Sequence, residues 1–146
     1  MKRLLLVVLI ISISFFSAFA QSLNDFIIID ELDEGYPKIK KKYHENKQVY
    51  QINEESVALE QISKAIRQTE IDELHIYTQT KPGEIIFKNL SITPDNVGSF
   101  SSDLETWSLN VFKSVVIHSD DVFDGDEGQL LREKLEETAG LLFETQ

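Results

Sequence analysis

The sequence predicts an α/β fold, a three-layer sandwich in which helices cover both faces of a mostly parallel sheet and a small β-hairpin is added. Two observations predict this class. Short runs rich in β-branched residues, such as 26–29 and 114–117, alternate along the chain with stretches of helical periodicity. These runs are apolar at most successive positions, which is typical of strands buried on both faces of a parallel sheet.

The first twenty residues predict a secretory signal peptide. Lys2 and Arg3 give a positive start, residues 4–16 are apolar except for two serines, and Ala-Phe-Ala at 18–20 supplies the small residues that signal peptidase reads. The alternative is a retained membrane anchor, but the apolar run is shorter than the roughly 20 residues that span a bilayer. We therefore expect cleavage before Gln21 and a secreted or periplasmic product.

The remaining chain, residues 21–146, has the size of one domain and can bury one hydrophobic core. It has no cysteine, which excludes disulfides, thiol nucleophiles, thiolate metal sites and a lipid-modified cysteine. Loss of the signal peptide would make its formal net charge two units more negative than the −11 of the full chain. We expect no nucleic-acid binding, because such a charge repels phosphate backbones, and no membrane span after cleavage.

The first half of the domain is predicted to contain three strands and two helices. Residues 26–29 form the first strand, and residues 36–43, with four lysines, form a short helix with a solvated side. Residues 48–52 form a second short strand. A helix that is capped by the Asn at its start follows over 53–69, and the third strand is centred on 74–77.

A hairpin and a longer helix come next. Pro82-Gly83 turns the chain into a hairpin of residues 84–87 and 90–92. Thr93-Pro94-Asp95 then combines a capping Thr, a Pro at the first helical position and an acid, which predicts a helix start. Apolar residues follow at spacings of three and four, so we expect Trp107 among them to be buried.

The end of the chain predicts a strand, a helix and a last strand. Residues 114–117 form the strand, and Asp126 caps a helix with an apolar stripe. Gly140 ends this helix, because glycine suits the left-handed position that follows a helix. Residues 141–143 add the last strand.

Polar residues follow two of the predicted strands. Ligands of parallel α/β sheets bind outside the carboxyl ends of the strands, near a switch in strand order. We therefore predict a pocket lined by the residues at these two ends, which are Thr78, Gln79, Thr80, His118, Ser119 and Asp120.

At these two ends the sequence resembles a bacterial family, domain of unknown function 4347. The best matching segments are LHIYTQTKPGEIIF (74–87) and VVIHSDDVFDGDEGQLLREKLEETAG (115–140), and the similarity covers nearly the whole of the predicted domain. The resemblance implies the α/β fold of caspase-like and gingipain-like cysteine peptidases. It also implies an association with large secreted adhesins, in which repeats usually follow this domain.

The match to the family pattern is uneven at the presumed catalytic pair. Pro82-Gly83, Gly128-Gln129 and the helix end at 138–140 agree with the pattern. The family's His falls on Gln79, and its Gly-Cys falls on His118-Ser119, so both members of the presumed His/Cys pair are replaced.

The replacing side chains are poor catalysts. The Gln79 carboxamide cannot accept and return a proton near neutral pH, and the Ser119 hydroxyl needs a base to become a nucleophile. His118 precedes Ser119, but neighbours on a strand point to opposite faces, and His75 lies deep in its strand. We expect no catalytic residue, and the alternative is a serine hydrolase that uses Ser119 with His118 or His75 as its base.

An acidic loop offers a possible calcium site. Five carboxylates fall within eight positions, and calcium prefers six to eight oxygen ligands. The spacing does not match the twelve-residue calcium loop, so a solvated acidic loop is the alternative. The candidate ligands are Asp120, Asp121, Asp124, Asp126 and Glu127.

Three functional hypotheses follow. The first is a secreted, non-catalytic module that binds an unknown protein or peptide partner without a cofactor. The second is the atypical serine hydrolase. The third is a calcium-responsive component of an adhesive surface, suggested by the acidic loop and by the family's usual association.

Overall fold

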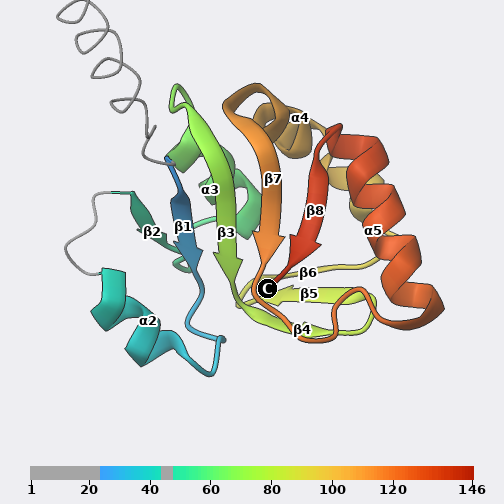
Figure 1. Cartoon of the computed structure of the whole chain (residues 1–146), viewed down its shortest axis with the longest axis horizontal. Coiled ribbons are helices and arrows are strands. Elements are labelled where there is room, and N and C mark those ends of the chain that lie inside the picture. The colour runs from blue at the N-terminus through green and yellow to red at the C-terminus, as the bar shows by residue number, and fades with distance from the viewer. Residues whose placement is uncertain (1–23, 44–47) are drawn as a thin grey trace, which may run out of the picture.

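A five-stranded sheet lies at the centre of the protein, shown in Figure 1 as a computed structural model that describes residues 24–43 and 48–146. All its neighbouring strands are parallel. The strand order is β2-β1-β3-β7-β8. β2 lies on one side of β1 and all later strands of this sheet lie on the other, so the order switches between β1 and β3. The strands are β1 (Phe26–Ile29), β2 (Val49–Gln51), β3 (Ile71–Tyr77), β7 (Val111–Ile117) and β8 (Leu142–Thr145).

Helices flank the sheet, which confirms the predicted α/β class. Helices α3, α4 and α5 share one core with the sheet, and α2 ends over the opposite face beside β1 (Figure 1). In the described part of the chain, α2 is the only helix on that second face. The helices are α2 (Tyr36–Tyr43), α3 (Ala58–Ile66), α4 (Ser101–Asn110) and α5 (Gly125–Ala139), and a 3₁₀ turn, η1 (Val97–Phe100), precedes α4.

The core lies between the sheet and helices α3, α4 and α5. Leu74 and Ile76 of β3 point into it, as do Val115 and Ile117 of β7. Trp107 of α4 is buried there, as the sequence predicts. Its indole N–H donates a hydrogen bond of 3.1 Å to the Ser63 hydroxyl, so the one polar atom of this large side chain is satisfied.

A second, smaller sheet lies across the carboxyl ends of the large one (Figure 1). Its three strands are antiparallel and comprise β4 (Gln79–Lys81), β5 (Glu84–Phe87) and β6 (Leu90–Ile92). The hairpin of β5 and β6 confirms the prediction, and β4 adds a strand that the sequence pattern did not indicate. The protein's own chain therefore covers the edge at which α/β proteins usually bind ligands.

Two predicted helix caps are wrong. Helix α3 begins at Ala58, and the Asn53 side chain instead accepts a hydrogen bond from the Glu55 N–H at 2.9 Å, which closes a local turn. Helix α5 begins at Gly125 with Asp124 at the N-cap position, so Asp126 lies in the first turn. Its predicted end is correct, because Gly140 follows it with φ of 67°.

The predicted helix start at 93–95 is also displaced. These residues begin a turn in which the Asn96 side chain accepts a hydrogen bond of 2.8 Å from the Thr93 N–H. The helical turn η1 starts only at Val97 and leads directly into α4. Asn96 thus satisfies the backbone locally and delays the helix.

The predicted signal peptide at 1–20 lies outside the described residues. Within the described ranges, no helix has the length and apolar character needed to cross a membrane.

Asp30 joins the two sheets. It follows β1, is fully buried, and accepts hydrogen bonds from two backbone N–H groups. These are the N–H of Leu32 at 2.9 Å and the N–H of Lys88, in the β5–β6 turn, at 3.0 Å. Both donors would lose their partner if the carboxylate were removed.

We predict that Asp30→Ala lowers the free energy of unfolding by on the order of 3 kcal/mol, because hydrogen bonds to a buried charge are strong and their loss leaves unsatisfied donors. Glu31→Ala is the matched control. Glu31 meets the side chain of Lys88 at the surface at 3.3 Å, and exposed pairs of this kind contribute at most about 1 kcal/mol. Urea unfolding measures both, and equal losses would contradict the role of Asp30.

Candidate functional site

The strand-end residues meet through Thr80 and Ser119. Their hydroxyl oxygens lie 2.6 Å apart. The Ser119 oxygen also accepts hydrogen bonds from the backbone N–H groups of Asp121 and Val122, at 3.2 and 3.1 Å, and lies 3.2 Å from the Asp121 carboxylate. A hydroxyl has two lone pairs, so the two N–H groups occupy both of them.

The other predicted pocket residues point elsewhere. Thr78 is buried, and its hydroxyl donates to the carbonyl of Ile86 in β5. Gln79 is exposed and begins β4, where side chains alternate, so it points away from the face on which Thr80 meets Ser119. His118 contacts residues on the second face of the large sheet. The structure thus brings together Thr80 and Ser119 but separates them from His118.

The acidic loop is mostly solvated. Asp120, Asp124, Asp126 and Glu127 are exposed, and Asp121 is half-buried against Ser119. Among the described residues, the group of acids and histidines whose ligand atoms converge does not include this loop. A calcium site in the loop stays a prediction.

A pocket of about 310 Å³ opens on the second face of the large sheet, near the end of α2. Side chains of β3 and of the residue that follows β7 form its floor, and the last turn of α2 forms one wall. It is lined by Asp25, Ile27, Lys42, Tyr43, Gln48, His75, Tyr77, His118 and Gln146.

Two histidines form the floor of this pocket. His75 lies on β3, and His118 follows β7 with its backbone N–H bonded to the carbonyl of Ile76 at 3.0 Å. His75 Nδ1 lies 2.9 Å from His118 Nε2, so one ring donates a hydrogen bond to the other. The His118 ring stacks on Tyr77 with 3.7 Å between the centroids and 9° between the planes. These contacts fix the orientation of both imidazoles.

The environment of His118 keeps it neutral. Burial lowers its pKa from the ordinary value of 6.5 to about 4, and the nearby charges of His75 and Lys42 act in the same direction. Burial also raises the pKa of Tyr77, with a further contribution from the Tyr43 hydroxyl. Both stacked rings are therefore uncharged near neutral pH.

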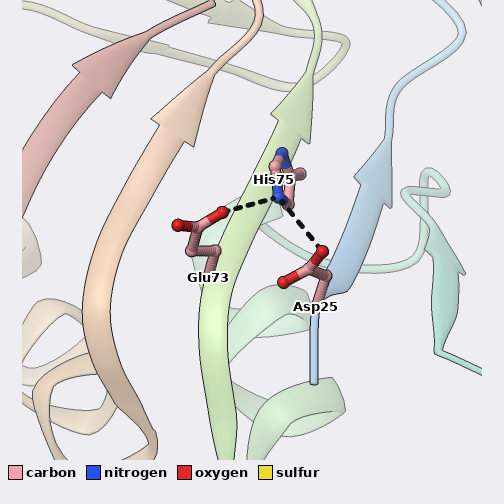
Figure 2. A group of neighbouring side chains, drawn as sticks. All are labelled: Asp25, Glu73 and His75. Carbon is pink, nitrogen blue, oxygen red and sulfur yellow. Dashed lines mark ion pairs between the residues drawn. The ribbon is translucent and has the colours of Figure 1, made fainter. Parts of the chain in front are cut away.

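The other ring nitrogen of His75 faces two carboxylates. His75 Nε2 lies 3.4 Å from an oxygen of Glu73 and 3.8 Å from an oxygen of Asp25, as Figure 2 shows. Glu73 and His75 are two residues apart on β3 and so share a face. Asp25 precedes β1, whose residue Phe26 pairs with Leu74, so the strand register places Asp25 beside Glu73.

Asp25 and Glu73 were not predicted as site residues, and His75 was considered only as an alternative base for Ser119. A usable signal was present: residues 73–77 alternate polar and apolar, which indicates a strand with one apolar and one polar face. The position of Asp25 cannot be predicted from such a local pattern, because it depends on how β1 pairs with β3.

A comparison with protein families matches residues 26–144 to the family described as domain of unknown function (DUF4347). The chain belongs to this family. Comparisons with curated proteins and with solved structures gave no match.

Two glycines of the segments that resemble the DUF4347 pattern have structural roles here. Gly83 has φ of 76°, and its N–H donates to the carbonyl of Val122 at 2.9 Å. A side chain on Gly83 would meet Glu127, and one on Gly128 would overlap the backbone of Phe123. These close approaches hold the turn after β4 against the loop after β7, which is how Thr80 and Ser119 come into contact.

The pKa of His118 generates a pH prediction for this DUF4347 domain. Between about pH 6.5 and pH 4 the unfolded chain binds a proton at this residue and the folded chain does not. We therefore expect stability to fall as the pH falls through this window. In NMR titrations, one of the three imidazoles should titrate near pH 4, and its signal should be absent in His118→Gln. Ordinary titration of all three near pH 6.5 would contradict this prediction.

Proposed function

We propose that this DUF4347 domain is an exported binding module without catalytic activity, derived from a caspase-like peptidase fold. The observation that carries the proposal is the state of the Ser119 hydroxyl. Both of its lone pairs accept backbone N–H groups, and in the described ranges no hydrogen bond joins it to an imidazole. Within the described part of the chain, a serine in this state has no imidazole base and no free lone pair for attack on a carbonyl carbon.

The pocket on the second sheet face supports a binding role. It offers a stacked Tyr77–His118 floor, the Lys42 cation on one wall and the Asp25 carboxylate at its base. Such a mixture of flat rings and opposite charges suits a polar ligand or a peptide side chain. The partner we propose is therefore a protein or peptide that presents a polar group to this pocket.

A serine hydrolase is the second candidate, because one observation favours it. The Ser119 oxygen lies 3.2 Å from an Asp121 oxygen and 2.6 Å from the Thr80 hydroxyl, so a carboxylate and a second hydroxyl are within reach. A carboxylate is a weaker base for a serine than an imidazole is, and for this reason we prefer the non-catalytic function.

We predict that the purified protein neither labels with a fluorophosphonate probe nor cleaves a mixed peptide library. Labelling is read by intact mass, with an established serine hydrolase as positive control. A mass shift that disappears in Ser119→Ala but persists in the neighbouring Ser114→Ala would overturn the non-catalytic proposal and establish the hydrolase.

Export is tested separately. When the full sequence is expressed in a bacterial host, we expect the protein outside the cytoplasm with Gln21 as its first residue, as measured by N-terminal sequencing. Replacing Ala18 and Ala20 by Asp should block this processing. A product that keeps Met1 and stays in the cytoplasm would contradict export without affecting the proposal for Ser119.

A further inference from the structure

We propose that Asp25, Glu73 and His75 form a binding site for a divalent transition-metal ion such as Zn²⁺. The site lies on the second face of the large sheet, opposite helices α3, α4 and α5. It adjoins the pocket that supports the proposed binding role and shares Asp25 with it, but the non-catalytic state of Ser119 does not depend on it. Failure of the metal titration and labelling of Ser119 are therefore distinguishable results.

The spacing of the three side chains fits such an ion. Their ligand atoms all lie within 4.8 Å of one another. Metal–ligand distances of about 2.0–2.1 Å place neighbouring atoms of a tetrahedral site about 3.3 Å apart. His75 Nε2 lies 3.4 Å from Glu73 and 3.8 Å from Asp25, so movements of a few tenths of an ångström would complete these two edges.

Unsatisfied polar atoms point to a missing ligand. His75 Nε2 and Asp25 Oδ1 are both shielded from solvent, and neither has a hydrogen-bond partner among the residues that the structure describes. Buried polar atoms without partners are rare because each costs free energy. The approaches of Glu73 and Asp25 to the imidazole are too long or too poorly aligned to be hydrogen bonds, and a cation among the three would give His75 Nε2 the partner it lacks.

The donor set selects the class of ion. Two carboxylates and one neutral imidazole carry two negative charges, which balance a divalent cation. Calcium and magnesium prefer all-oxygen sites, whereas an imidazole nitrogen favours zinc and neighbouring transition metals. Three protein ligands leave a fourth position, and the 310 Å³ pocket that adjoins the site would let water or a ligand group occupy it.

His118 would act as a positioning residue. A metal-binding histidine usually donates its second ring N–H to an acceptor, which fixes the tautomer and the ring orientation. His118 Nε2, 2.9 Å from His75 Nδ1, is placed to accept that proton. The stack on Tyr77 holds His118 in turn, so the whole arrangement exists before any ion binds.

The test uses protein expressed from the full sequence, purified and treated with a chelator. Zn²⁺ is titrated in competition with a chromophoric chelator, and Co²⁺ is added separately to read the coordination from its visible absorption. We expect one Zn²⁺ per chain. Affinity should fall at least about tenfold in the near-isosteric variants Asp25→Asn and Glu73→Gln and in His75→Gln, with the Co²⁺ spectrum lost.

Two control variants and two variants of His118 make the result decisive. Asp120→Asn removes the same charge from the exposed acidic loop, and His44→Gln removes an imidazole outside the described residues; both should bind as the parent does. His118→Phe keeps a stacked ring but removes the acceptor, so affinity should fall, and His118→Gln should restore it. A separate calcium titration tests whether the acidic loop binds Ca²⁺.

Circular dichroism and thermal unfolding establish whether each variant folds. If His75→Gln does not fold, Asp25→Asn and Glu73→Gln decide the question. Absence of binding at micromolar Zn²⁺ would overturn the proposal. Equal binding by the parent and by the Asp25 and Glu73 variants would do so too, because it would show adventitious binding elsewhere.

Discussion

The alternation of side chains along β3 is the constraint on which the rest of the molecule depends. β3 is the middle strand of the large sheet, and its side chains point alternately to the two faces. Leu74 and Ile76 join the core beneath α3, α4 and α5, and this burial stabilises the domain. The same pleat forces Glu73, His75 and Tyr77 to the opposite face. Core formation and the assembly of a polar site are therefore two results of one geometric rule.

The carboxyl edge of the sheet has a different role here from its usual one. In open α/β sheets this edge is where ligands bind, but β4, β5 and β6 lie across it. Asp30 fastens that small sheet to β1, and the contact between Thr80 and Ser119 fastens it to the end of β7. The DUF4347 segments at this edge thus maintain a tertiary contact, whereas the pocket with concentrated charge and aromatic rings lies on the adjacent face.

Much of the fold could be predicted from the sequence, because buried strands and the hairpin carry strong local patterns. The helix starts could not. Asn53 and Asn96 are residues typical of helix caps, but each satisfies a turn instead, and local sequence does not distinguish the two uses. Strand β4 was missed because 79–81 is polar and becomes a strand only by pairing with β5. The site was harder still, since Asp25 meets Glu73 through strand register alone.

The dependence of the Asp25, Glu73 and His75 cluster on register has a kinetic consequence. Parallel strands distant in the chain pair late, because closing the long loop between them costs entropy before any contact forms. A slip of β3 by one residue would turn His75 toward the hydrophobic core and Ile76 toward the second face of the sheet. The cluster can exist only in the native alignment of the strands. Its formation therefore distinguishes the native state from a state in which β3 is shifted by one residue.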